Sequence, residues 1–178
     1  MSCPATVSNP VLIPNPMKTL FIFRHAKSSW DDAVMDDHQR PLNKRGKEDA
    51  PRMGLLMRKK DLLPDLVLCS TAKRARKTIE LAVEAAGYQG EIKFLEELYA
   101  APPSAYLDAL SKVSEDHQRV MVVGHNPGLE QLLFLLTGKL EPMPTAALAQ
   151  VDLPIEKWVH IDEKIHGELI GIWRPKDL

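Results

Sequence analysis

The sequence predicts one α/β domain in three layers, with helices on both faces of a mostly parallel sheet that has an antiparallel edge. Three short apolar runs, at 19–23, 66–69 and 120–123, are each followed by turn-type residues and a helical stretch. Such continuous runs are typical of strands buried on both faces. The last third of the chain instead has two strand-like runs with little helix between them. A length of 178 residues suits one domain of this kind and is too short for two.

Strands and helices are expected to alternate along most of the chain. The expected strands are 19–23, 66–69, 120–123, 147–153 and 168–173. Helices are expected where apolar residues recur at helical spacing, at 43–60, 71–86, 106–113 and 127–137. Pro51 lies inside the first of these helices, and we expect it to kink or shorten that element because proline removes a hydrogen-bond donor.

Helix boundaries are predicted from capping residues. Ser70 or Thr71 is expected to cap the second helix, and Gly87 to end it. Asn126 is the expected cap of the fourth helix, and Gly138 its end. The second and fourth predicted helices therefore have stated start and stop signals that the structure can test.

Composition excludes several classes of protein. The chain has 23 basic and 24 acidic residues, a formal net charge of −1, which gives no overall electrostatic reason to bind nucleic acid or a membrane. Cys3 and Cys69 have neither metal-ligand nor disulfide-scaffold spacing, and Cys69 reads as a small buried residue. No apolar run approaches the roughly 18 residues of a membrane-spanning helix. We therefore expect a soluble monomer in the reducing cytoplasm.

The first sixteen residues differ from the rest of the chain. They include four prolines and no charged side chain, and they show neither a helical nor a strand period. A signal peptide would have a positive start and a longer apolar stretch. We expect a flexible N-terminal tail over 1–16 and the folded domain over 17–178.

Arginine and histidine side chains follow the three buried runs closely. Arg24 and His25 come directly after the first, Arg74 lies shortly after the second, and His125 follows the third. The carboxyl ends of parallel strands meet at one side of a sheet, where open α/β folds bind their ligands. We therefore expect these four side chains to lie together, although His25 and His125 are far apart in the sequence.

This set of side chains is suited to a phosphoryl group. Arginine forks match phosphate oxygens, and the N-termini of the following helices add N–H donors. These strand ends carry no acidic cluster for magnesium and no GxxxxGK[ST] loop, so we expect neither a metal nor a cofactor. A histidine among cations stays neutral near pH 7, and its free nitrogen can attack phosphorus.

The three strand-end motifs resemble the histidine phosphatase superfamily, which has the phosphoglycerate mutase-like fold. Those motifs are Arg24-His25-Ala26, Arg74 in the segment 70–78, and Gly124-His125. The short chain and the segments at 24–30, 40–46 and 123–128 are most similar to the SixA-type phosphohistidine phosphatases of that superfamily. The resemblance extends from Lys18 to Pro175, essentially the whole domain.

The resemblance implies a role for each site residue. His25 would be the nucleophile and would carry a transient phosphoryl group. Arg24, Arg74 and His125 would hold the phosphoryl oxygens, and Arg40 is a further candidate for the phosphate pocket. The implied mechanism needs no metal, because side chains supply the positive charge.

The proton donor is less well defined by the resemblance. Many relatives use a carboxylate to protonate the leaving group, and Glu97 is the nearest match, whereas SixA-like members are thought to manage without a strong acid. Lys73, Arg76 and Lys77 lie off the motif, and we expect them to form a solvated rim that steers an acidic or phosphorylated partner.

Other polar and aromatic residues are given structural roles. Four histidines are expected on the surface: His38, His117, His160 and His166. Four aspartates are expected in a solvated loop, since their spacing fits no EF-hand: Asp31, Asp32, Asp36 and Asp37. Partial core packing, rather than a place in a substrate groove, is expected for Trp30 and Trp158.

Three functions follow from these residues. The first is hydrolysis of phosphohistidine on proteins, which an open site suits because the short chain leaves little room for insertions that would roof it. The second is the same chemistry on a small phosphorylated metabolite. The third is a phosphate-binding module without turnover, which the intact set of Arg24, His25, Arg74 and His125 disfavours. The expected partner is accordingly a phosphorylated protein or a small phosphoester.

Overall fold

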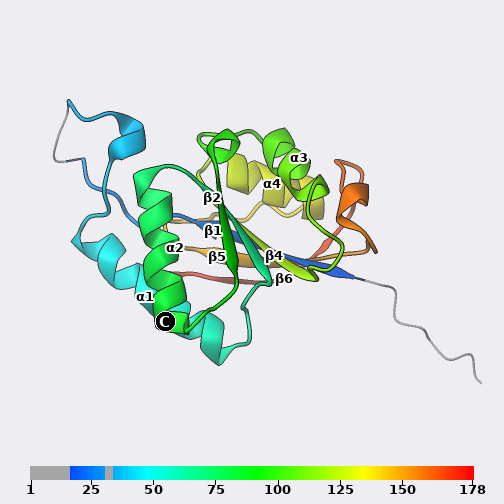
Figure 1. The fold of residues 1–178 in the computed structure, drawn as a ribbon, viewed down its shortest axis with the longest axis horizontal. Helices are drawn as coiled ribbons and strands as arrows, with labels where there is room; N and C mark the ends of the chain where they lie inside the picture. The colour runs from blue at the N-terminus through cyan, green and yellow to red at the C-terminus, as the bar shows by residue number, and fades with distance from the viewer. Residues whose placement is uncertain (1–16, 31–33) are drawn as a thin grey trace, which may run out of the picture.

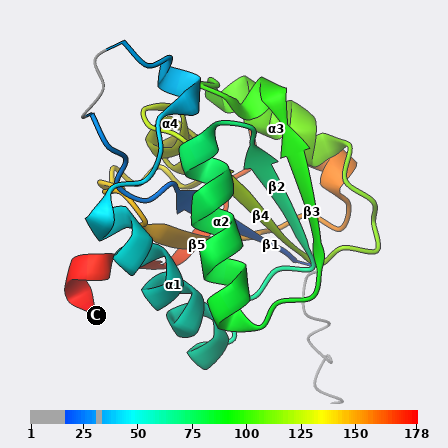
Figure 2. The ribbon, with the colours of Figure 1, turned by 60° about the vertical axis from the view of Figure 1, so that its left-hand side comes forward.

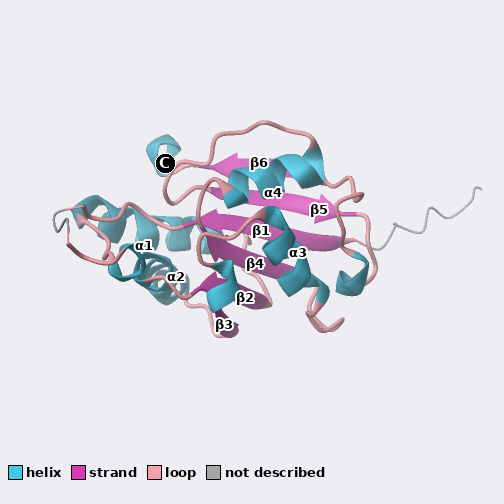
Figure 3. Cartoon of the chain, turned by 90° about the horizontal axis from the view of Figure 1, so that it is seen from above, coloured by secondary structure: helices cyan, strands magenta, loops and turns pink. Residues whose placement is uncertain are grey.

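A six-stranded sheet forms the centre of the molecule (Figures 1 and 3). The computed structural model describes residues 17–30 and 34–178, so the tail expected over 1–16 lies outside the described residues. The strand order is β3-β2-β4-β1-β5-β6. The strands are β1 (Lys18–Arg24), β2 (Leu66–Ser70), β3 (Glu91–Leu95), β4 (Arg119–Gly124), β5 (Leu148–Leu153) and β6 (Glu168–Trp173).

Four strands of the sheet are parallel, and an antiparallel pair completes it. Strand β4 lies between β1 and β2 and is parallel to both, and β3 is parallel to β2. Strand β5 runs antiparallel to β1 and to β6. The predicted mostly parallel sheet with an antiparallel edge is therefore confirmed, and it brings the carboxyl ends of β1, β2 and β4 together.

Helices cover both faces of the sheet, and Figure 2 shows α1 and α2 side by side on one of them. The helices are α1 (Lys44–Lys59), α2 (Lys73–Ala86), α3 (Pro103–Ser111) and α4 (Gly128–Thr137). Side chains of β1 alternate between the two layers: Leu20 and Ile22 pack with α3 and α4, and Phe21 and Phe23 pack with α1 and α2. No helix in the described ranges is long and apolar enough to cross a membrane.

Strand β3 is absent from the strands that the sequence predicts. Its five residues alternate between exposed and half-buried positions, and none of them is fully buried. An edge strand with charged residues on one side lacks the continuous apolar run that marks the central strands. The missed strand matters because the segment that follows it enters the site.

Of the two effects predicted for Pro51, a kink or a shortened helix, shortening does not occur, and a kink stays a prediction. Helix α1 continues through Pro51 to Lys59. The carbonyl oxygen of Lys47 loses the donor that a different residue at position 51 would have supplied, but Lys47 is exposed, so water can replace the missing hydrogen bond.

Both predicted N-terminal caps are wrong, whereas both glycine stops are confirmed. Ala72 occupies the cap of α2 and Pro127 that of α4, and neither offers a capping side chain. The Asn126 amide instead donates to Glu130 and to the carbonyl of Met143. Gly87 and Gly138 end α2 and α4 in the left-handed conformation, at φ values of 68° and 67°.

The two tryptophans differ in burial. Trp158 packs in the core, as predicted, but is fully and not partly buried, and its indole N–H donates to the carbonyl of His117 at 2.7 Å. The prediction for Trp30 is wrong, because this side chain is 72% exposed. Its ring lies 3.3 Å from the guanidinium carbon of Arg40, so it packs on a cation instead of the core.

Candidate active site

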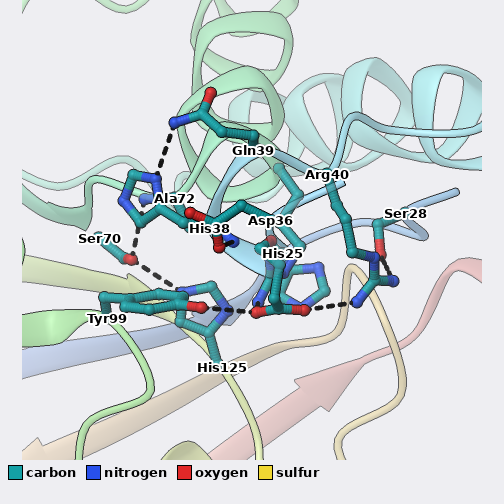
Figure 4. A network of polar contacts seen from close by, with 12 residues as sticks. His25, Ser28, Asp36, His38, Gln39, Arg40, Ser70, Ala72, Tyr99 and His125 are labelled. Carbon is teal, nitrogen blue, oxygen red and sulfur yellow. Dashed lines mark hydrogen bonds and ion pairs between the residues drawn. The ribbon is translucent and has the colours of Figure 1, made fainter. Parts of the chain in front are cut away.

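Two histidines meet where β1 and β4 end. These strands pair in register so that Arg24 lies opposite Gly124, and the N–H of His25 donates to the Gly124 carbonyl at 3.1 Å. The next residue on each strand is therefore a histidine, and the rings of His25 and His125 lie 5.0 Å apart between centroids. Figure 4 shows the two rings side by side. The expected juxtaposition is present.

His25 presents a nitrogen suited to nucleophilic attack. Its Nδ1 lies 2.7 Å from the carbonyl oxygen of Ala26, and because a carbonyl only accepts, Nδ1 must carry the hydrogen. The lone pair is then on Nε2. The pKa of His25 is lowered to about 3, mainly by burial and also by the nearby His125, Arg74 and Arg24, and these effects outweigh the opposing effect of the Ala26 hydrogen bond. The imidazole is therefore neutral at physiological pH.

Two buried nitrogens beside this ring have no partner among the described residues. They are Nε of Arg24 and Nδ1 of His125. The other ring nitrogen of His125 lies 2.8 Å from the hydroxyl of Ser70, which can donate its proton there and leave the hydrogen of His125 on Nδ1. Each unsatisfied buried donor costs about 1–3 kcal/mol. An oxyanion that accepts from both would remove this cost.

Burial, together with the positive charge of Arg74, also lowers the pKa of His125 to about 3. Desolvation likewise lowers the pKa of Arg24, whose guanidinium donates to the carbonyl of Met143 at 2.8 Å. The site therefore contains two neutral imidazoles, those of His25 and His125, together with the partly buried guanidinium of Arg24. Such surroundings strengthen hydrogen bonds to an anion, since little water competes for them.

Asp37 holds two of the predicted phosphate-binding arginines. It lies in the short helix η1 (Asp37–Gln39), where one carboxylate oxygen accepts from Arg40 at 2.8 Å and the other from Arg74 at 3.0 Å. The second oxygen also accepts from the hydroxyl of Tyr99 at 2.7 Å. The Tyr99 hydrogen bond, together with both arginines, holds the pKa of Asp37 well below its usual range.

Asp37 is therefore part of the site: it is exposed, as predicted for a solvated loop, but its carboxylate also has contacts that the sequence did not predict. Its side chain is half exposed, yet it joins three residues that come from distant parts of the chain. The structure does expose Asp36, as predicted, whereas Asp31 and Asp32 lie outside the described residues. The approach of Arg74 depends on the fold and has no signal in the spacing of the aspartates.

Tyr99 and His38 are further site residues that the sequence does not reveal. The ring of Tyr99 stands edge-on to His125, with centroids 5.7 Å apart, and His38 stands edge-on to Tyr99 at 4.8 Å. The Nε2 atom of His38 also lies 3.0 Å from the hydroxyl of Thr71, and His38 is half-buried, so its prediction as a surface histidine is confirmed only in part. Recognition of β3 would have indicated Tyr99, because this residue follows the end of that strand.

Of the two remaining predicted residues, Arg40 is connected to the site and Glu97 is not. Arg40 is buried and joins the site through Asp37, with further bonds to Ser28 and to the carbonyl of Ser29. Glu97 is exposed in η2 (Glu96–Leu98), and its charge acts on Lys112, the residue that follows α3. The structure does not bring Glu97 into the network around His25, and its role as an acid stays a prediction.

The other expected surface and core positions agree with the structure, except that His117 is only partly exposed. His160 and His166 are exposed, His117 is half-buried, and Cys69 is fully buried, which raises the pKa of its thiol well above the usual range. Lys73, Arg76 and Lys77 are exposed on α2. Within residues 17–30 and 34–178, no group of three or more His, Cys, Asp or Glu side chains is placed to hold a metal ion.

Comparisons with known proteins indicate to which family this chain is related. Residues 20–99 match the histidine phosphatase superfamily (branch 1). An uncharacterized chloroplastic protein of Arabidopsis thaliana is 33% identical over 144 residues, which is 75% of this chain and 66% of that protein. An uncharacterized protein of Mycobacterium tuberculosis (strain CDC 1551 / Oshkosh) is 36% identical over 113 residues, 64% of this chain and 68% of that protein. The matches thus span about two thirds of each relative's length.

Solved structures of SixA proteins have the same fold. The structure from Nakamurella multipartitia superposes with a TM-score of 0.78 at 26% identity, over 89% of this chain and 96% of that one. The structure from Agrobacterium tumefaciens gives a TM-score of 0.77 at 29% identity, over 90% and 99% of the two chains. This chain belongs to the histidine phosphatase superfamily, and its structure is of the SixA type.

Proposed function

We propose that this phosphatase hydrolyses phosphohistidine on proteins through a covalent phosphohistidine intermediate on His25. One observation carries the proposal. The Nε2 lone pair of His25 is free in a buried site; His125, whose ring lies 5.0 Å away, and Arg24, whose charge acts on His25, each have an unpartnered buried nitrogen. A nucleophile and two oxyanion donors are what phosphoryl transfer requires.

The reaction would proceed in two displacements. In the first, His25 Nε2 attacks phosphorus and the substrate P–N bond breaks, so the phosphoryl group passes to His25 while the leaving imidazole takes a proton from solvent. In the second, water attacks the same phosphorus, the His25–phosphorus bond breaks, and phosphate leaves. Arg24, Arg74 and His125 would hold the oxygens in both steps, and Arg74 would have to share its N–H groups between Asp37 and the phosphoryl group.

The comparisons support the choice of substrate in part. A structure described as the protein histidine phosphatase SixA complexed with tungstate superposes with a TM-score of 0.75 at 25% identity, over 89% of this chain and 98% of that one. The same fold also occurs in an Escherichia coli structure described as an alpha-ribazole-5'-P phosphatase, at 19% identity and a TM-score of 0.66. Hydrolysis of a small phosphorylated metabolite is therefore the second candidate.

Phosphate release in EDTA tests the proposal. The wild-type chain is assayed on a phosphohistidine-bearing protein and on a panel of phosphomonoesters. We expect faster release from phosphohistidine, complete loss in His25→Ala, and a phosphoenzyme on His25 that is labile in acid and stable in base. His160→Ala, which changes an exposed histidine, is the matched control and should keep full activity.

Each other outcome has a definite meaning. Near-normal turnover by His25→Ala would disprove the mechanism. Preference for one phosphomonoester would keep the mechanism and assign the chain to small metabolites. Tight phosphate binding without release from any substrate would make the site a binding module.

A further inference from the structure

A groove with basic walls lies beside the histidine pair. It has a volume of about 600 Å³ and lies between the start of α1 and the start of α2. Lys47 comes from α1, and Lys73, Arg76, Lys77 and Glu80 come from the exposed side of α2. We call this feature, with His38 and Thr71 as its inner wall, the basic groove.

The basic groove is electrostatically distinct from the rest of the molecule. Four cationic side chains and one carboxylate line it, although the formal net charge of the whole chain is −1. Lys77 approaches Glu80 at 3.5 Å in an exposed pair, which neutralises little of this charge. Lys47 and Lys73 have no ion pair among the described residues. The N-terminus of α2, which has no capping side chain, adds further positive potential.

The inner wall of the basic groove is shared with the candidate active site. His38 contacts Thr71 on the groove side and faces Tyr99, whose ring in turn faces His125. Ser70, the residue before Thr71, contacts His125 directly. Figure 4 shows this succession of side chains from His38 to His125. When the phosphoryl group of a substrate lies at His25, the neighbouring part of that substrate can therefore extend along the protein surface into the basic groove.

We propose that the basic groove binds acidic side chains that flank the phosphohistidine of a protein substrate, an inference that rests on the proposed function. The volume is sufficient for more than one side chain, which suits a polypeptide. Lysines on a flexible stem act as point charges and suit carboxylates without demanding one geometry. The lysines of the basic groove would then contribute to the affinity for the substrate and to the rate of association, and not to the chemical step.

Binding of two matched peptides tests this inference without requiring turnover. Both carry a stable phosphonate analogue of phosphohistidine, flanked by three glutamates in one peptide and by three glutamines in the other. We expect the wild-type full chain to bind the glutamate peptide at least tenfold more tightly at low salt. In Lys73→Gln/Lys77→Gln this preference should fall to about twofold or less, with binding of the glutamine peptide unchanged.

The control variant is Lys139→Gln/Lys164→Gln, which removes two exposed lysines far from the groove. Equal dissociation constants for the two peptides in the wild type would overturn the inference, as would a preference that survives in Lys73→Gln/Lys77→Gln or disappears equally in the control. Absence of binding by either peptide would also overturn it. Thermal unfolding of each variant shows whether the fold is retained.

The same peptides separate this inference from the proposed function. Phosphate release from the phosphohistidine form of the glutamine peptide reports on the function alone. Release without any preference for glutamate would leave the function standing and remove the groove's role. Preferred binding of the glutamate peptide without any release of phosphate would support the role of the basic groove and contradict the proposed function.

Discussion

At the scale of single residues, the site depends on which nitrogens are already engaged. The Ala26 carbonyl fixes the hydrogen of His25 on Nδ1, and the Ser70 hydroxyl occupies Nε2 of His125. Each ring is therefore left with one nitrogen available, a nucleophile on His25 and, when the Ser70 hydroxyl donates to Nε2, a donor on His125. Burial keeps both rings neutral, because it lowers the pKa of each to about 3. The positive charge of the site comes from its arginines.

Arg74→Ala should lower kcat by on the order of 10²-fold or more, because one charge-stabilising donor is lost in the transition state. Its guanidinium donates to both the backbone and the carboxylate of Asp37, so the variant also releases η1. Steady-state kinetics on a small phosphoester measure the effect. Arg58→Ala, at the exposed end of α1, is the control, and an equal loss in both variants would contradict this role for Arg74.

At the scale of elements, short segments outside the sheet complete the site. Helix η1 places Asp37 and His38 at the N-terminal end of α2, and the segment after β3 places Tyr99 against His125. The position of η1 depends on how closely α1 and α2 pack, since residues 40–43 connect η1 to α1 and α2 supplies Arg74. Gly54 marks that close approach: a Cβ at this position would lie 2.0 Å from the carbonyl oxygen of Ala82.

Gly54→Ala should destabilise the protein by about 1–3 kcal/mol, because the added carbon forces the two helix backbones apart. The gain in helix propensity from alanine, up to about 1 kcal/mol, offsets only part of this cost. Urea unfolding measures the free energy of unfolding. Glu48→Ala, at an exposed position of the same helix, should change it by less than about 0.5 kcal/mol. A Gly54→Ala protein as stable as the wild type would show that the helices can separate freely.

At the scale of the whole molecule, the parallel half of the sheet creates the site and the buried histidines make stability depend on pH. The unfolded chain binds protons on histidine near pH 6.5, whereas folded His25 and His125 resist protonation until about pH 3. As the pH falls below 6.5, proton uptake therefore favours the unfolded state.

Lowering the pH from 7 to 5 should reduce the free energy of unfolding by on the order of 2 kcal/mol for each of these two histidines. Urea titrations at several pH values measure the slope. His25→Gln and His125→Gln should each remove their own share of it, while His160→Gln, which changes an exposed histidine, should leave it unaltered. A slope that neither buried variant changes would mean that other groups govern the pH dependence.

The sequence alone was sufficient for the order of the central elements and for the histidine and arginine set. Continuous apolar runs such as 19–23 leave few alternatives to a strand buried on both faces, and the ends of parallel strands then converge by geometry. The same rule places His25 beside His125 and, through β2 and α2, brings Arg74 near them. The glycine stops of α2 and α4 were equally predictable, because few other residues adopt a positive φ there.

Only the tertiary structure decided which side chains complete the site and which atoms remain free. Asp37, His38 and Tyr99 reach the histidines from irregular segments, whose paths depend on packing and not on a local periodicity. Ser70 and Asn126 are residue types that often cap helices. In the folded chain, however, Ser70 contacts His125, and the Asn126 amide donates to Glu130 and to the carbonyl of Met143. Hydrogen-bonding side chains have several possible partners, and long-range contacts select among them, whereas an apolar run has a single favourable environment, the core.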